Sequence, residues 1–230
     1  TVGAALDSGV LTAGGAGATG TQNLYIHLNT GAANTLTINS RITDNGAATV
    51  RLIFTPYNGG TLVLPNALNS YTGGTVVNGW TQSGGTLSVT AAGAVPAGGL
   101  TISGSAAVSV TVAGGIAASN DIIINGSGTL TLNGANTLQS ITFNNIGGLA
   151  NPTVTTGGVL NVTGGITATS SNPATVATIA GTFDLGGGAE TFNVAPVTVN
   201  SLTNLAPLTA TLNVTALVQN GSINKTGAGN

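Results

Sequence analysis

Short segments in which apolar and polar residues alternate recur along the whole chain. Residues 108–112, for example, read Val-Ser-Val-Thr-Val. A period of two predicts a strand with one buried face and one solvated face. Gly-rich or Asn-rich stretches separate these segments at intervals of roughly ten residues, which fits a sandwich, a barrel or a solenoid. The predicted strands are residues 35–38, 49–54, 61–64, 86–89, 100–102, 122–124, 129–132, 159–162 and 211–214.

The length and content of these strands favour a solenoid among the three architectures. Most of them are only about four residues long and carry Thr, Asn or Ser on the alternate face. A sandwich normally has longer strands and more aromatic filling in a core about 10 Å thick. Small branched side chains suit the narrow interior of a solenoid. An antiparallel sandwich completed by strand exchange remains the alternative, with residues 1–20 either a swapped strand or an ordinary first turn.

Internal similarity supports a repeat architecture. Residues 60–71 resemble residues 128–138, and residues 181–192 are a looser echo of both. Each begins as Gly-Thr, continues with an apolar strand, and passes through a turn of small residues into another strand. Degenerate repeats of this size are typical of solenoids, because one unit cannot bury its own apolar face.

One stretch resembles a known repeat family. Residues 69–79 read Asn-Ser-Tyr-Thr-Gly-Gly-Thr-Val-Val-Asn-Gly, and residues 85–89 read Gly-Thr-Leu-Ser-Val. This is similar to the autotransporter-associated β-strand repeat, and the clearest motif spans residues 60–89. The resemblance implies a right-handed parallel β-helix in the passenger region of a secreted or surface-anchored bacterial protein. Residues 222–230 resemble the beginning of a further unit, so we expect residues 1–230 to be a single β-solenoid segment of a longer protein.

The composition agrees with a stack of tight turns. The chain has 37 Gly, 3 Lys and Arg together, and no Met, so strong helix formers are scarce. Gly and Asn suit corners that require positive φ. Turns of roughly 20–25 residues, stacked at about 4.8 Å, predict about ten turns and a rod of roughly 50 Å. Asn and Thr at equivalent positions are expected to form hydrogen-bonded ladders.

The shortage of reactive groups excludes several function classes. The chain contains 5 Asp and Glu, one His and no Cys, whereas an active site needs convergent titratable groups. Three basic residues are too few to neutralise a run of phosphates, so no nucleic-acid partner is expected. The uncharged stretch 92–119 alternates and is interrupted by Gly and Pro, so no membrane insertion by this segment is expected. No catalytic residue, metal ligand or cofactor is predicted.

Individual candidates each have a simpler explanation. Asp184 and Glu190 are the closest acids and could form a hydrolase pair or a weak cation site, but turn residues are favoured. His27 shares one face of a strand with Tyr25 and is interpreted as an ordinary exposed residue. Tyr71 is expected to pack inside, and Trp80 is the one residue proposed to contact a ligand.

Five Thr-x-Thr pairs raise the question of an ice-binding face. Their spacings differ too much for one turn length to align them, so strand propensity is the preferred explanation. The pairs begin at residues 35, 129, 153, 167 and 209.

Three functions follow from these observations. The first is a non-catalytic structural or adhesive scaffold, extracellular or on the bacterial cell surface, with neighbouring repeats of the same protein and host or surface glycans as partners. The second is a self-assembling subunit of a filament or surface array. The third is an enzyme acting on polysaccharides, which is disfavoured.

Overall fold

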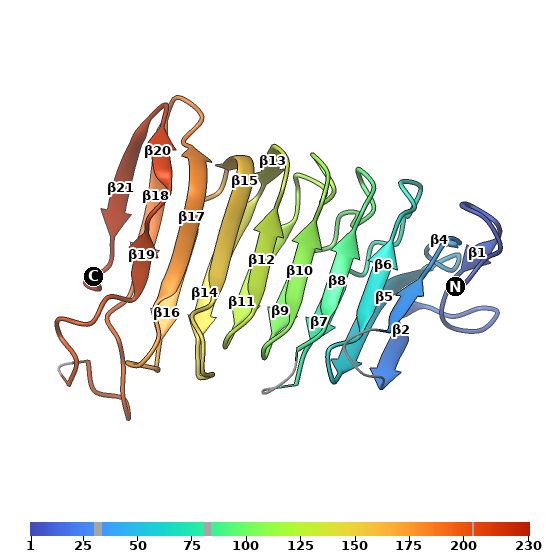
Figure 1. The fold of residues 1–230 in the computed structure, drawn as a ribbon, viewed down its shortest axis with the longest axis horizontal. Coiled ribbons are helices and arrows are strands. Elements are labelled where there is room, and N and C mark those ends of the chain that lie inside the picture. The colour runs from blue at the N-terminus through green and yellow to red at the C-terminus, as the bar shows by residue number, and fades with distance from the viewer. Residues whose placement is uncertain (30–33, 81–83, 204) are drawn as a thin grey trace.

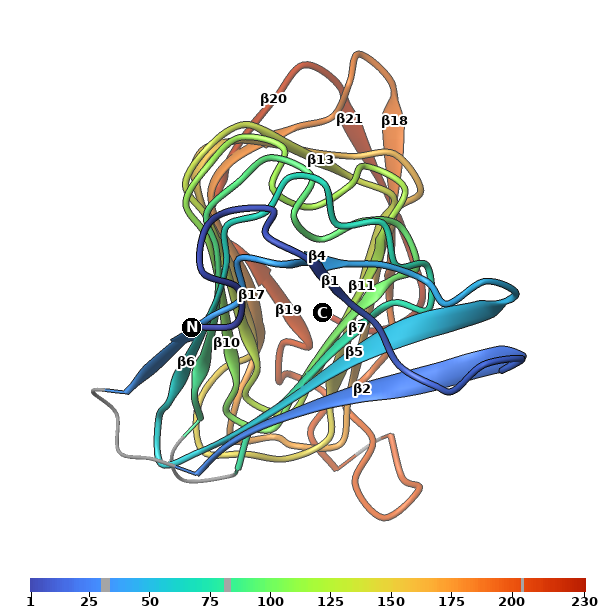
Figure 2. The ribbon, with the colours of Figure 1, turned by 90° about the vertical axis from the view of Figure 1, so that its right-hand side faces the viewer.

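A computed structural model describes residues 1–29, 34–80, 84–203 and 205–230. These residues form strands and connecting turns without any helix, so none of them belongs to a helix able to cross a membrane. Two parallel sheets run along the molecule and face each other across a common interior (Figures 1 and 2). The protein is a right-handed parallel β-helix, as predicted.

Nine of the described strands form the first sheet, called the nine-stranded sheet below. In spatial order they are β2 (Gly20–Asn29), β5 (Ala48–Tyr57), β7 (Thr75–Asn78), β9 (Leu100–Ser103), β11 (Asp121–Asn125), β14 (Ser140–Asn145), β16 (Ile166–Ser170), β18 (Ala189–Val194) and β21 (Ser222–Thr226).

The opposite sheet, called the ten-stranded sheet below, has eight strands in its main order. They are β3 (Thr35–Thr37), β6 (Thr61–Leu64), β8 (Thr86–Val89), β10 (Ala107–Val110), β12 (Thr129–Leu132), β15 (Thr153–Val162), β17 (Ala177–Asp184) and β19 (Leu212–Val214). In addition, β13 (Asn136–Leu138) pairs with β15, and β20 (Leu217–Gln219) pairs with β17.

The first residues of the chain pair with residues about one turn further along the same chain. Val2 forms a parallel bridge with Ile38, and β1 (Val10–Leu11) pairs in parallel with β4 (Arg41–Ile42). The structure thus places residues 1–20 in the first turn of the solenoid, paired with the turn that follows. Since every pairing between the named strands is parallel, the antiparallel sandwich is wrong.

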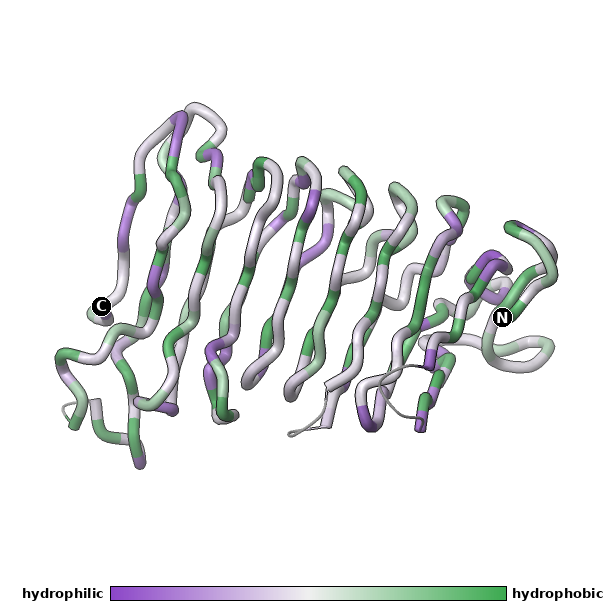
Figure 3. The backbone as a smooth tube through the Cα atoms, in the orientation of Figure 1, coloured by the Kyte–Doolittle hydropathy of each residue, from purple (hydrophilic) through white to green (hydrophobic). Residues whose placement is uncertain are grey.

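Rows of apolar side chains fill the interior. Figure 3 shows hydrophobic residues recurring along the strands of both sheets. The turn length can be read from one row of the ten-stranded sheet. This row is Leu36, Leu62, Leu87, Val108, Leu130, Val154, Ile179 and Val214, which gives turns of 26, 25, 21, 22, 24, 25 and 35 residues.

The solenoid is shorter than the sequence predicted. It has about 7 turns, and nine strands at a spacing of about 4.8 Å span about 38 Å rather than 50 Å. The last turn accounts for part of the difference, because an excursion between β18 and β19 lengthens it to 35 residues. The nine-stranded sheet also begins late in the chain, because its first strand, β2, starts only at Gly20.

The predicted ladder of polar side chains is present on the outer face of the nine-stranded sheet. Asn125 Nδ2 donates to Ser103 Oγ at 3.1 Å, and Asn144 Nδ2 donates to Asn125 Oδ1 at 3.0 Å. Thr169 Oγ1 then donates to Asn144 Oδ1 at 3.2 Å. Four consecutive turns are thus joined by side chains as well as by backbone.

The internal repeats are only partly in register. Thr61 and Thr129 occupy one row of the ten-stranded sheet, which continues to Thr153 and Thr178. Thr182, the matching residue of the third echo, instead pairs with Val159. The resemblance of residues 181–192 to the other two segments is therefore local and does not mark an equivalent position in the turn.

Candidate functional site

The Asn-Ser-Tyr-Thr-Gly-Gly-Thr motif forms a corner that ties three turns together. Asn69 accepts from the Ile42 N–H at 2.9 Å and donates to the Ala94 carbonyl at 2.8 Å. Tyr71 is fully buried, as predicted, and its hydroxyl forms a 2.7 Å hydrogen bond with the Thr75 hydroxyl. Burial raises the pKa of Tyr71, so this phenol stays protonated.

The two glycines of the motif lie where a side chain would collide with a neighbouring turn. A Cβ on Gly73 would lie 2.6 Å from the Val50 carbonyl oxygen. Gly74 has φ of +86°, and a Cβ there would lie 2.3 Å from the Gly98 oxygen. The motif is therefore explained by the packing of the corner.

At the same corner, the Asp44 carboxylate connects two segments of the chain. Asp44 Oδ1 accepts from the backbone N–H groups of Val50 and Thr72, and its Oδ2 accepts from the Thr72 hydroxyl. Partial burial opposes ionisation of Asp44, but these three hydrogen bonds prevail and lower its pKa. Asp44 therefore has a structural role.

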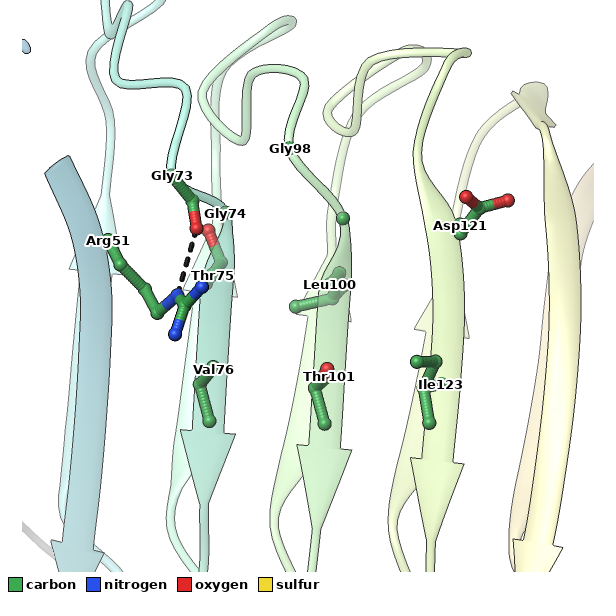
Figure 4. A pocket seen from close by; sticks show the side chains of 11 residues that line it. Arg51, Gly73, Gly74, Thr75, Val76, Gly98, Leu100, Thr101, Asp121 and Ile123 are labelled. Carbon is green, nitrogen blue, oxygen red and sulfur yellow. Dashed lines mark hydrogen bonds between the residues drawn. The ribbon is translucent and has the colours of Figure 1, made fainter. Parts of the chain in front are cut away.

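Beside the glycines, the outer face of the nine-stranded sheet is hollowed by about 400 Å³. Figure 4 shows Val76, Thr101 and Ile123 side by side on β7, β9 and β11, with Arg51 and Asp121 on opposite sides. Because glycines replace side chains above this row, the backbone forms the floor of the hollow.

Both charged groups of the hollow are bound by the protein. Arg51 Nε donates to the Gly73 carbonyl at 3.0 Å, and Asp121 Oδ1 accepts from the Ser140 hydroxyl at 2.5 Å. The hollow thus offers one cation, one carboxylate and backbone polar groups. These groups can hold a polar ligand, but they do not include the paired nucleophile and base of covalent catalysis.

The acid pair Asp184 and Glu190 lies on either side of a corner, in different sheets. Asp184 ends β17, and hydrogen bonds from the Gly186 N–H, then Gln219 and Asn220, lower its pKa. Glu190 lies in β18, where burial raises its pKa against a backbone hydrogen bond from Gly165. Asp184 thus has the contacts of a turn residue.

Three of the five Thr-x-Thr pairs lie in one register, contrary to the sequence prediction. The pairs beginning at Thr35, Thr129 and Thr153 occupy the same two rows of the ten-stranded sheet. Turns of 26, 25, 21 and 22 residues add up to the 94-residue spacing between the first two pairs. Val63, Ala107 and Ala180 interrupt these rows of hydroxyl side chains, and Ser88 and Ser109 occupy two further positions in place of Thr.

The two remaining candidates are exposed aromatic residues. His27 lies on the outer face of β2 and is stacked with Tyr25, with ring centroids 6.1 Å apart. Trp80 follows β7, and its ring meets that of Tyr57 edge to face at 5.8 Å. The sequence did not indicate Tyr57 as a neighbour of Trp80; the only available signal was their separation of about one turn.

The titratable groups do not assemble into a metal centre. Across the described ranges, no three His, Asp or Glu side chains form a cluster able to hold a metal ion. Comparison of the chain with protein-family models, with curated proteins and with solved structures gives no match.

Proposed function

We propose that this chain is a non-catalytic scaffold, a stiff β-solenoid segment of an extracellular or surface-attached bacterial protein. The observation that carries the proposal is the unbroken stacking of parallel strands in two facing sheets, reinforced by the Asn125 ladder and the Asn69 bridge. Such a body transmits force along backbone ladders and presents its corners outward. The motif resemblance to autotransporter-associated repeats points to the same role.

The arrangement of polar groups also supports a scaffold over an enzyme. Asp44 and Asp184 are each held by several hydrogen bonds within their own corners. Arg41 is paired with Asp7 at 2.8 Å. These charged groups stabilise turns instead of converging on a cleft.

The location is tested on intact cells that produce the protein. An antibody raised against the folded chain should label unpermeabilised cells or filaments that they release, and added protease should remove the label. Labelling only after permeabilisation would contradict the proposal. A cytoplasmic protein labelled in parallel provides the control for cell integrity.

The enzyme alternative needs its own test. Purified chain incubated with a panel of polysaccharides should release no reducing ends above those of an Asp184→Asn, Glu190→Gln double variant. Activity that is lost in this variant would replace the scaffold with a hydrolase.

A self-assembling subunit is the second candidate. Within the described part of the chain, β2 and β21 each have a strand neighbour on one side only, and an open edge can pair with another strand. If copies stack end to end, sedimentation velocity should show species that grow with concentration. A single sedimenting species from micromolar to millimolar concentration would argue against assembly.

A further inference from the structure

The solvent-exposed aromatic rings of this protein are gathered at one place. Of its eight Phe, Tyr and Trp residues, five are buried in the interior. The other three, Tyr25, Tyr57 and Trp80, are 56%, 43% and 58% exposed. Tyr25 lies with the only histidine, His27, on the outer face of β2, Tyr57 lies on the outer face of β5, and Trp80 follows the end of β7; we call these four residues the aromatic patch.

Register explains how the patch is assembled. In the pairing of β2 with β5, Tyr25 is opposite Ile53, His27 is opposite Thr55, and Asn29 is opposite Tyr57. Residues at alternate positions of a strand point to the same face. Tyr25 and His27 therefore lie beside the outer residues of β5, and Trp80 reaches Tyr57 from the following turn.

The rings of the patch contact one another in pairs. Those of Tyr25 and His27 are parallel within 2°, and the Tyr25 hydroxyl accepts from Asn23 Nδ2 at 3.0 Å. Tyr57 and Trp80 meet at 73°. The Ser105 hydroxyl donates to the Trp80 carbonyl, which fastens the backbone of Trp80 to the next turn. A prearranged set of rings loses little conformational entropy when a ligand binds.

The patch borders a hollow of about 390 Å³, which His27 and Tyr57 help to line. This volume falls in the lower part of the range of about 300–1,000 Å³ typical of small-ligand pockets. Its lining mixes an aromatic ring, an imidazole, an amide, a hydroxyl and an apolar side chain. These residues are Tyr57, His27, Asn29, Thr55 and Leu28.

The aromatic patch and the hollow together combine exposed ring surface with uncharged hydrogen-bonding groups. Asn29 and Thr55 carry an amide and a hydroxyl, and none of the described residues that line the hollow is an Asp or Glu. Arg51, on the same face of β5, directs its Nε to the Gly73 carbonyl. A phosphate-rich ligand would require a run of cations, and an anionic or cationic peptide would lack a partner charge here.

We propose that the aromatic patch is a binding site for a neutral oligosaccharide. The apolar C–H face of a sugar ring would stack on Tyr57 or Trp80, since an aromatic ring offers a large apolar surface with a polar handle. Sugar hydroxyls would exchange hydrogen bonds with Asn29, Thr55 and His27. This inference rests on the proposed scaffold function and adds to it the class of ligand presented at one corner.

The single tryptophan makes the proposal directly measurable. Neutral hexasaccharides of glucose (α-1,4 and β-1,4 linked) and of N-acetylglucosamine are titrated into the purified chain, and Trp80 fluorescence is followed together with saturation-transfer NMR of the sugar. A glycan array extends the panel of neutral probes. We expect a saturable change in fluorescence and transfer to sugar C–H protons for at least one neutral oligosaccharide.

Variants connect the binding to the patch. Tyr57→Ala removes a ring on which the sugar is proposed to stack and should raise the Kd by about tenfold, a typical effect of removing an aromatic anchor. Tyr25→Ala removes the ring stacked with His27 and should raise the Kd in the same direction. Leu149→Ala is the matched control, because Leu149 is 88% exposed and lies outside the patch; it should leave the Kd unchanged. Far-UV circular dichroism of each variant establishes that the solenoid is intact.

Three results would overturn the proposal: no saturable binding to any neutral probe, wild-type affinity in both tyrosine variants, or tighter binding of an acidic oligosaccharide such as a heparin hexasaccharide. None of them would alter the labelling of intact cells, so failure of the glycan site can be distinguished from failure of the scaffold role. Conversely, if the protein binds a glycan but is labelled only inside cells, the binding site is supported and the surface function is contradicted.

Discussion

Replacing Asn69 by Ala should destabilise the solenoid at the corner of the Tyr-Thr-Gly-Gly motif. The Asn69 side chain is 7% exposed and bridges two residues that lie 27 positions earlier and 25 positions later. The substitution leaves the Ile42 N–H and the Ala94 carbonyl buried without this partner. An unsatisfied buried polar group costs about 1–3 kcal/mol, so we expect a loss of about 2–6 kcal/mol.

The assay is urea unfolding followed by far-UV circular dichroism, combined with hydrogen exchange. The Ile42 amide should exchange faster in Asn69→Ala, because its hydrogen bond to Asn69 Oδ1 is removed. Asn224→Ala, on the exposed strand β21, is the matched control and should change stability by less than about 0.5 kcal/mol.

A second substitution at the same position tests the direction of the two hydrogen bonds. In Asn69→Asp, the ionised carboxylate accepts from Ile42 but repels the Ala94 carbonyl, whereas the protonated acid can donate to it. The folded state therefore favours the proton and raises the pKa of this Asp. The stabilisation of the folded state by this protonated Asp is present below its unfolded pKa of about 3.9 and is lost as pH rises through its folded pKa. Equal stability of the wild type and Asn69→Ala, within about 0.5 kcal/mol, would refute this reasoning.

Three further substitutions test other parts of the interior. Tyr71→Phe should cost about 1–3 kcal/mol in the urea assay, because the Thr75 hydroxyl is left buried without its partner, and adding Thr75→Val should recover part of the loss. Leu130→Ala removes a fully buried side chain from the central row and should cost about 2–5 kcal/mol; a loss below about 1 kcal/mol would indicate a loosely packed interior. Hydrogen bonds lower the pKa of Asp44, so its stabilisation is present above the ordinary pKa and is lost as pH falls through the folded value. As the pH is lowered from 6 to 2, the melting temperature of Asp44→Asn should therefore fall less steeply than that of the wild type.

The strands could be predicted because each is a local pattern. Residues 61–64, 86–89 and 129–132 alternate with a period of two, and they coincide with β6, β8 and β12. Burial of a strand face depends on residues only two positions apart, so no long-range information is required. The same reasoning placed Tyr25 and His27 correctly on one outer face.

The alignment of distant residues could not be predicted, because it depends on the length of every turn between them. Thr35 and Thr129 share a row because the four turns between them, although unequal in length, add up to their separation of 94 residues. The aromatic patch shows the same limit: the contact between Tyr57 and Trp80 requires the register of β5 with β7 and the path of the corner after each. Composition and local periodicity contain neither quantity.

Because the turns are unequal in length, the number of residues in a turn affects the width of the molecule but not its length along the stack. Along the stack, each turn advances by one strand spacing of about 4.8 Å, whether it contains 21 residues or 35. Residues inserted at a corner widen the molecule locally and leave the axial position of every later turn unchanged. The axial position of a residue thus depends on the number of turns before it and not on the number of residues. Corner loops can therefore be exchanged or enlarged without moving a binding group relative to its neighbours along the axis.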